Sequence, residues 1–389
     1  MYAKRDSENG VSLCAVLFWG SIVMEYRINR RTGDAVSIIG MGTSSLPESQ
    51  EDEAVATLRM AYEQGINYYD LATAESRCFA LFGAAFADVR SKVRYQIHFG
   101  AIYAEGKSYA WSLNLDKIKR SIAWQLEELK TDYIDYGFIH CLDEEQDWQT
   151  YQKNGVLRYL EELKRQNIVH HLGFSTHNPV TANHILDTNL MDMMMFSINA
   201  GYDYQHGEFA RGSALARMEL YQRCEAMGVG ISVMKPFSGG QLLQDKTSPF
   251  GRALTSYQCI QYVLDKPGVL TVLPGIRNRM ELQNILGFFD AAPEERDYSL
   301  ISTLTPKDMD GRCVYCNHCQ PCPSGLDVGL INKYYDLARA GDELAVDHYK
   351  HLILHADACN RCGHCNRRCP FHVDQVARMK EIDAYFAHR

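Results

Sequence analysis

The sequence lacks several features, and each absence excludes a class of protein. Its 389 residues carry a formal net charge of -8 and contain no long basic run, so an extended nucleic-acid surface is not expected. The most apolar N-terminal run, at residues 11–24, is too short to span a bilayer. We therefore expect a small-molecule substrate and no nucleic-acid or membrane partner.

The run at residues 11–24 is the only candidate for a targeting segment. Lys4 and Arg5 precede it, as in a signal peptide, but so do Asp6 and Glu8, and there is no clear small-x-small cleavage site. We predict instead an N-terminal extension over residues 1–23, with Met24 opening the folded part.

Cysteine is sparse through most of the chain and dense at its end. Eight of the 13 cysteines fall in two tight clusters within the last 80 residues, and the other five are isolated. This distribution does not suit a disulfide framework and indicates metal ligation in a reducing compartment. We therefore predict a cytoplasmic protein.

What the sequence has in abundance is an alternation of strand-like and helix-like segments. Eight short β-rich apolar runs occur at residues 36–43, 67–72, 93–100, 133–140, 169–176, 193–200, 230–236 and 269–276. Helical patterns lie between them, such as residues 52–65, where Gly65 is a candidate C-cap. Eight such units predict an α/β fold, a (β/α)8 TIM barrel, over residues 24–299. A doubly wound open sheet is the alternative.

Polar residues follow these runs where the predicted strands end, which is where barrel enzymes place their chemistry. They are Asp70, His98, His140, His177, Asn199, Lys235 and Arg277. A single strand-end histidine is more often structural, but so many polar side chains at one rim predict an active site.

The remaining residues, 300–389, form a predicted second, mainly helical domain with the two cysteine clusters. The clusters are Cys313, Cys316, Cys319 and Cys322, and Cys359, Cys362, Cys365 and Cys369. Successive spacings of three and a closing Cys-Pro are typical of ferredoxins that hold two [4Fe-4S] clusters, whereas zinc sites separate their CxxC pairs. A purely structural role for the clusters stays open.

The ferredoxin pattern also predicts how the thiolates are shared. One cluster would take Cys313, Cys316, Cys319 and Cys369, and the other Cys359, Cys362, Cys365 and Cys322. The first run is one residue shorter before its Cys-Pro, so the fourth ligand of each cluster is left open. The segment between the runs, residues 331–355, has a helical pattern.

From Met24 to its end the chain resembles the aldo-keto reductases, in the branch with a C-terminal dicluster ferredoxin-like module. The resemblance rests on MEYRINRRTGDAVSIIGMGT, INYYDLA, DYIDYGFIH, HHLGFSTHNP, ISVMKPFSGGQL and VLPGIRNRMELQN. It implies a TIM barrel that reduces carbonyls with NAD(P)H through an Asp, Tyr, Lys and His tetrad.

Two members of the tetrad are matched and two are replaced. Asp70 and His140 match, but Glu75 stands at the position of the Tyr and His98 at that of the Lys. A protonated Glu75, or His98 or His140 as imidazolium, would then be the acid. Alternatively, these four predicted catalytic residues bind a divalent metal ion.

The resemblance also implies a set of nucleotide-binding residues. Ser175 and Asn199 would lie near the nicotinamide, Lys235, Ser238 and Gly240 near the pyrophosphate, and Gly275, Arg277, Arg279 and Asn284 around the adenosine and any 2'-phosphate. The two arginines have a plainer alternative as part of a solvated loop, and Met195 stands where the family often has a cofactor-binding Gln.

Together these features predict an iron-sulfur oxidoreductase for a small carbonyl or hydroxy compound. Electrons would pass through two [4Fe-4S] clusters, with NAD(P)H as a further cofactor and a ferredoxin or other redox protein as partner. One alternative is a lyase or isomerase that uses Glu75, His98 and His140, with structural clusters. Another is an electron-transfer partner without catalytic activity.

Overall fold

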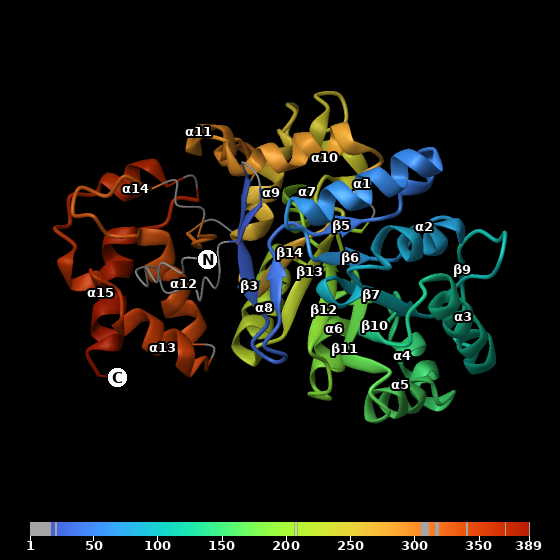
Figure 1. The fold of residues 1–389 in the computed structure, drawn as a ribbon. Helices are drawn as coiled ribbons and strands as arrows, with labels where there is room; N and C mark the ends of the chain where they lie inside the picture. The colour runs from blue at the N-terminus through green and yellow to red at the C-terminus, as the bar shows by residue number, and fades with distance from the viewer. Residues whose placement is uncertain are drawn as a thin grey trace.

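Eight parallel strands form the centre of the chain. A computed structural model describes residues 17–19, 22–205, 207, 209–304, 311–315, 319–339, 341–369 and 371–388. The strands are β5 (Met41–Gly42), β6 (Tyr68–Asp70), β7 (Arg94–Phe99), β10 (Ile134–Ile139), β11 (Val169–Thr176), β12 (Met193–Ser197), β13 (Gly230–Met234) and β14 (Val269–Val272). They pair in chain order, and parallel bridges from Ile39 to Val272 and from Gly42 to Gly275 join the last strand to the first. The predicted eight-stranded parallel barrel is thus confirmed as a nearly closed ring (Figure 1).

The first predicted strand, residues 36–43, is divided between two sheets. Only β5 joins the barrel, while β4 (Ala35–Ser37) pairs antiparallel with β3 (Tyr26–Ile28). A second hairpin joins β1 (Leu17–Trp19) to β2 (Ile22–Met24), so the predicted extension includes described strand. Residues 1–16 lie outside the described residues. In the described part of the chain, no helix has the length and apolar character needed to cross a membrane.

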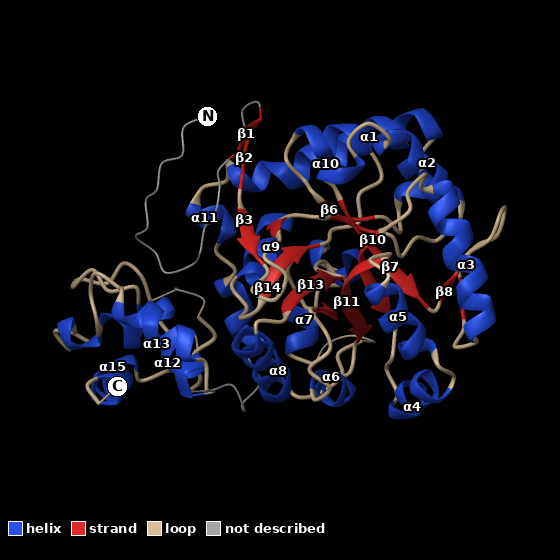
Figure 2. Cartoon of the chain, turned by 60° about the horizontal axis from the view of Figure 1, so that its bottom comes forward, coloured by secondary structure: helices blue, strands red, loops and turns tan. Residues whose placement is uncertain are grey.

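Helices surround the strands (Figure 2). They are α1 (Glu51–Glu63), α2 (Arg77–Phe86), α3 (Leu115–Glu128), α4 (Glu145–Lys153), α5 (Val156–Arg165), α6 (Pro179–Leu186), α7 (Ala200–Asp203), α8 (Ala214–Met227), α9 (Ser256–Leu264), α10 (Arg279–Leu286) and α11 (Pro293–Arg296). Gly65 is the predicted C-cap of α1, but the C-cap is Gln64, and Gly65 follows it with a φ of 92° and an N–H that bonds to the carbonyl of Tyr62. Between β7 and α3, the short strands β8 (Ala101–Ile102) and β9 (Ala110–Trp111) form a hairpin over the barrel rim.

Apolar side chains cover both faces of the barrel sheet. One cluster inside the ring includes Tyr68, Tyr136, Phe138 and Met193, all fully buried. A much larger cluster lies between the strands and the helices. Because both faces of the sheet are covered, its polar side chains gather where the strands end.

The C-terminal residues form helices beside the barrel, at the left of Figure 1. These are α12 (Val328–Arg339), α13 (Glu343–Lys350), α14 (His364–Arg368) and α15 (Gln375–Phe386). The helical pattern at residues 331–355 is therefore two helices, since Gly341 between them has a φ of 97°. Tyr315 accepts a 2.7 Å hydrogen bond from the Gln222 side chain, and Phe371 stacks on Tyr204 with ring centroids 6.3 Å apart.

Candidate functional site

A chain of hydrogen bonds joins three strand ends at the mouth of the barrel. Asp70 ends β6, His98 lies in β7 and His140 follows β10. The His98 Nε2 is 2.6 Å from the Asp70 Oδ1, and the His98 Nδ1 is 3.0 Å from the His140 Nδ1. The structure therefore brings together three of the four predicted catalytic residues.

The hydrogens of this chain fit one arrangement when both imidazoles are neutral. His98 donates its Nε2–H to the carboxylate of Asp70, and His140 donates its Nδ1–H to the His98 Nδ1. Burial lowers the pKa of His140 well below its usual range, and the neighbouring His98 and His177 lower it further. The His140 Nε2 is then left as an acceptor.

A tyrosine that the sequence analysis did not single out completes the chain. Tyr109, just before β9, has its hydroxyl 3.0 Å from the His140 Nε2. Burial raises the pKa of Tyr109 to about 12, so the phenol keeps its proton and donates it to His140. The side chain is 42% exposed, and so the chain runs from solvent to a buried carboxylate. The only signal in the sequence was its place in the loop between two predicted elements.

Glu75 does not join this chain. Its side chain is 54% exposed, and its Oε2 is 3.1 Å from the guanidinium of Arg77. The backbone of Glu75 bridges antiparallel to Ser108, which fixes this segment against the loop before β9. The predicted four-residue metal site of Asp70, Glu75, His98 and His140 is therefore not assembled by the described side chains.

Gln96 supports the inner end of the chain from two residues earlier in β7. Its amide nitrogen donates to the Asp70 Oδ1 at 2.8 Å and to the Met195 sulfur at 3.1 Å. Its oxygen accepts from the hydroxyls of Tyr68 and Ser232 at 2.7 and 2.9 Å. Gln96 and His98 therefore both donate to the same Asp70 oxygen, and together they hold the carboxylate in place.

A cavity of about 660 Å³ opens beside Asp70. Of the nine predicted nucleotide-binding residues, five line it: Lys235, Gly240, Gly275, Arg277 and Asn284. Met195 and Asp70 form its wall next to the hydrogen-bonded chain. This volume lies within the range typical of small-molecule and cofactor sites.

The other four predicted nucleotide-binding residues have different surroundings. Ser175 and Asn199 are buried: Ser175 accepts a 2.7 Å hydrogen bond from the backbone of Cys141, and Asn199 caps α7 and donates to the Lys235 carbonyl at 2.8 Å. Ser238 bonds to the Gln241 side chain, 3.3 Å away. Ser175 thus contacts the residue that follows His140 at the end of β10, and Asn199 contacts Lys235, which lines the cavity.

Both predicted phosphate-binding arginines form ion pairs. Arg277 contacts Glu281 and, at 3.3 Å, Glu48, while Arg279 contacts Glu53 at 2.8 Å. Each arginine side chain is at least half exposed. An entering phosphate would have to compete with these carboxylates.

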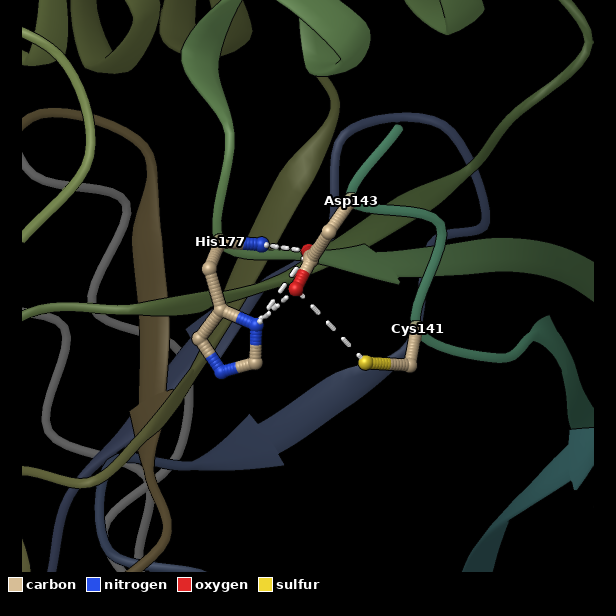
Figure 3. Close-up of side chains that lie close together, drawn as sticks. All are labelled: Cys141, Asp143 and His177. Carbon is tan, nitrogen blue, oxygen red and sulfur yellow. Dashed lines mark hydrogen bonds and ion pairs between the residues drawn. The ribbon is translucent and has the colours of Figure 1, made fainter. Parts of the chain in front are cut away.

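A second polar cluster lies on the rim beside His140, at the ends of β10 and β11. Cys141 and Asp143 follow β10, and His177 follows β11 (Figure 3). The His177 Nδ1 is 3.0 Å from the Asp143 Oδ2, and the Cys141 thiol is 3.8 Å from the same oxygen. Burial would raise the pKa of Asp143, but hydrogen bonds from His177 lower it to about 2. Burial and the charge of Asp143 raise the pKa of the Cys141 thiol to about 12.

Four cysteines of the C-terminal module line one small cavity. They are Cys322, Cys359, Cys362 and Cys365, the set that the spacing assigned to one cluster. Cys313 and Cys369 of the other predicted set both pack against the barrel core, Cys319 is buried in the module, and Cys316 lies outside the described residues. No disulfide bond joins two cysteines of the described ranges.

The fold and the rim together define a class of protein, the (β/α)8 barrel enzymes with a site at the carboxyl ends of the strands. A family model described as "Aldo/keto reductase family" matches residues 38–258, more than half of the chain. The chain therefore belongs to the aldo/keto reductase family, a family of oxidoreductases. The predicted family resemblance is confirmed at this level.

Curated relatives agree with this assignment, and a solved structure has a similar fold. The chain is 24% identical over 298 residues to the uncharacterized oxidoreductase YqkF of Bacillus subtilis (strain 168), covering 70% of this chain and 94% of that protein. It is 29% identical over 161 residues to L-galactose dehydrogenase of Arabidopsis thaliana, covering 39% and 48%. The holo form of the aldo-keto reductase AKR11C1 from Bacillus halodurans matches the fold with a TM-score of 0.59 at 22% identity, over 73% of this chain and 97% of that one.

Proposed function

We propose that the chain is an NAD(P)H-linked oxidoreductase for a small carbonyl or hydroxy compound, with a dicluster iron-sulfur module that exchanges single electrons. The observation that carries the proposal is the hydrogen-bonded chain from Asp70 through His98 and His140 to Tyr109. Asp70 also lies on the wall of the adjoining cavity. A group that moves protons thus adjoins a space large enough for a cofactor.

The cavity residues fit a dinucleotide. Lys235 offers a cation for the pyrophosphate, and Gly240 and Gly275 leave room for the backbone to approach it, since a Cβ on Gly240 would meet nothing within 4 Å. Asn284 and Arg277 line the other part of the cavity. When bound, NAD(P)H would supply the hydride of a carbonyl reduction.

The hydrogen-bonded residues Asp70, His98, His140 and Tyr109 would supply the proton. When the Asp70–His98 pair carries an additional proton, both ring nitrogens of His98 donate hydrogen bonds. His140 then accepts at its Nδ1 and carries its own hydrogen on the Nε2, from which it donates to the Tyr109 oxygen. Tyr109 then gives its own proton to the developing alkoxide and recovers one from His140. In alcohol oxidation the same hydrogen-bonded residues, with both imidazoles neutral, would accept the proton of the alcohol through Tyr109. Tyr109 would therefore do the work of the family's Tyr from a different segment, and the alternative of a lyase that relies on Glu75 has less support.

The cysteine-lined cavity supports the iron-sulfur part of the proposal. Four thiols around one cavity, three of them in a CxxCxxC run, suit a [4Fe-4S] cluster. Cys313 and Cys369 would place the second cluster nearer the barrel. From there, the contact of Phe371 with Tyr204 leads to α7, whose cap Asn199 lies beside the cavity residue Lys235. The clusters would lie in series between an outside partner, such as a ferredoxin, and the barrel.

The test uses the full chain purified without oxygen. Fluorescence titration with NADH and NADPH should show saturable binding, and small aldehydes and ketones should be reduced. Tyr109→Phe should bind nucleotide normally and lose about 100- to 10,000-fold in kcat. Tyr133→Phe is the matched control, because Tyr133 stacks on His170 before β10, at the opposite end of that strand. Failure to bind either nucleotide would refute the hydride reaction, and an unchanged kcat in Tyr109→Phe would remove that residue from it.

A further inference from the structure

The cluster of Cys141, Asp143 and His177 lies on the rim of the barrel but has no part in the proton transfer described above. All three residues come from the loops that follow β10 and β11, and Cys141 directly follows His140. Their potential ligand atoms, one from each side chain, lie within 4.8 Å of one another. This closeness calls for an explanation, because a thiol, a carboxylate and an imidazole are a typical set of zinc ligands.

The spacing of these atoms is near that of ligands around one ion. The Asp143 Oδ2 is 3.8 Å from the Cys141 Sγ and 3.0 Å from the His177 Nδ1. With zinc bonds of about 2.3 Å to sulfur and about 2.0 Å to oxygen and nitrogen, tetrahedral ligand atoms lie about 3.2 to 3.6 Å apart. The side chains would need to move by only fractions of an ångström along these two edges.

The protein already holds the carboxylate in position from its other side. The Asp143 Oδ1 accepts hydrogen bonds from the His177 backbone at 2.7 Å and from the Thr176 hydroxyl at 3.1 Å. The Asn178 side chain donates to the Asp143 carbonyl at 3.0 Å. These bonds leave the Oδ2 facing the thiol and the imidazole, as Figure 3 shows.

Apart from the His177 imidazole, the described part of the chain places no cationic side chain in an ion pair with Asp143. Arg211 bonds instead to the Asp143 carbonyl and the Glu144 side chain, and the Lys235 ammonium lies 4.2 Å from the ring centre of Phe209. The His177 side chain is only 6% exposed, and its Nε2 is buried without a hydrogen-bond partner in the described structure. A partly buried carboxylate that no lysine or arginine of the described ranges neutralises favours a metal ion, and the His177 Nδ1 and the Cys141 Sγ face the same carboxylate oxygen.

We propose that Cys141, Asp143 and His177 bind one divalent metal ion of the zinc type. Three protein ligands leave a coordination position open, as in catalytic zinc sites. Cys141 directly follows His140 in the sequence. A substrate oxygen bound to the metal at the open coordination position would therefore lie beside the hydrogen-bonded chain that includes His140. A nucleophilic role for Cys141 has less support, since its thiol bonds to Asp143 and not to an imidazole nitrogen.

The test measures zinc bound by the full chain, kept under argon with its cysteine module in place. After equilibrium dialysis against micromolar Zn²⁺, the wild-type chain should hold one more zinc equivalent than Cys141→Ser or His177→Gln. Cys78→Ser is the matched control, since Cys78 is a thiol of the barrel outside this cluster, and it should hold as much as the wild type. The difference excludes zinc taken up by the module. Equal zinc content in wild type and Cys141→Ser would overturn the proposal.

A second measurement needs no variant and covers the case in which a substitution prevents folding. Zn²⁺ should slow the alkylation of Cys141 by iodoacetamide in the wild-type chain at least tenfold, measured by mass spectrometry of the peptide. An equal alkylation rate with and without Zn²⁺ would also overturn the proposal. Neither measurement depends on nucleotide binding or carbonyl reduction, so the site and the proposed function are tested separately.

Discussion

Arg217 offers the sharpest test of how the barrel is stabilised. It lies in α8 with none of its side chain exposed, and its Nε is 2.8 Å from the Asp203 Oδ1. Asp203, in α7, also accepts hydrogen bonds from the hydroxyls of Tyr221 and Tyr262, at 2.6 and 2.7 Å. Replacing Arg217 by Met would leave this buried carboxylate without its cation.

The expected cost follows from burial. Removing one partner of a buried ion pair costs about 3–5 kcal/mol, because the remaining charge stays out of water. The two tyrosine hydroxyls would still solvate Asp203, so we expect the lower half of this range, about 3–4 kcal/mol. For a chain of 389 residues that unfolds as one unit, this corresponds to a fall in Tm of about 4–5 °C. Arg217→Met with Asp203→Asn should recover part of the loss.

The assay is equilibrium unfolding in urea, followed by circular dichroism. Arg223→Met is the matched control, because Arg223 lies on the same helix and pairs with Asp187 at 2.6 Å, but the Asp187 side chain is 63% exposed. That variant should lose at most about 1 kcal/mol. Equal losses in the two variants would refute the argument from burial.

Further outcomes are expected elsewhere. Gly83→Ala should destabilise the barrel by about 1–3 kcal/mol in the same urea assay, because a Cβ would lie 2.2 Å from the carbonyl oxygen of Glu128 and push α2 from α3. Burial would raise the pKa of Asp34, but a hydrogen bond from Arg94 lowers it overall, so the stability it adds is present above the unfolded pKa of about 3.9 and is lost as the pH falls through the folded pKa. Asp34→Asn should therefore flatten the acid limb of a plot of unfolding free energy against pH; an unchanged slope would contradict this. Cys322→Ser should lower anaerobic iron content from about eight to about four atoms per chain, and full iron in that variant would contradict the cluster assignment.

The strands were predictable because each one is a short apolar run separated from the next by a helical pattern, and parallel strands need such crossovers. The places of Asp70, His98 and His140 followed from the same regularity, since strand ends meet at one rim. The division of residues 36–43 was not predictable, because an apolar run does not show whether its partner is a barrel strand or a hairpin.

The far end of the proton chain could not be predicted, since it depends on a loop. Tyr109 reaches His140 only because β8 and β9 fold back over the rim, and each of those strands has two residues. Glu75 stands at the sequence offset of the family's Tyr, yet its backbone bridge to Ser108 and its ion pair with Arg77 hold it elsewhere. Sequence spacing therefore predicts where a residue lies along the fold, but the direction of its side chain depends on contacts with segments distant in sequence.

The sequence divides at residue 300 into a barrel and a cysteine-rich segment, but the apolar core does not divide there. Val314, Tyr315, Phe371 and Val373 belong to the cysteine-rich segment, but all four are buried in the same apolar cluster as the barrel. A chain shortened to its first 299 residues would expose the surface that these side chains cover, and such a surface promotes aggregation. The two halves are therefore expected to unfold in a single transition, and neither is a natural unit for separate expression.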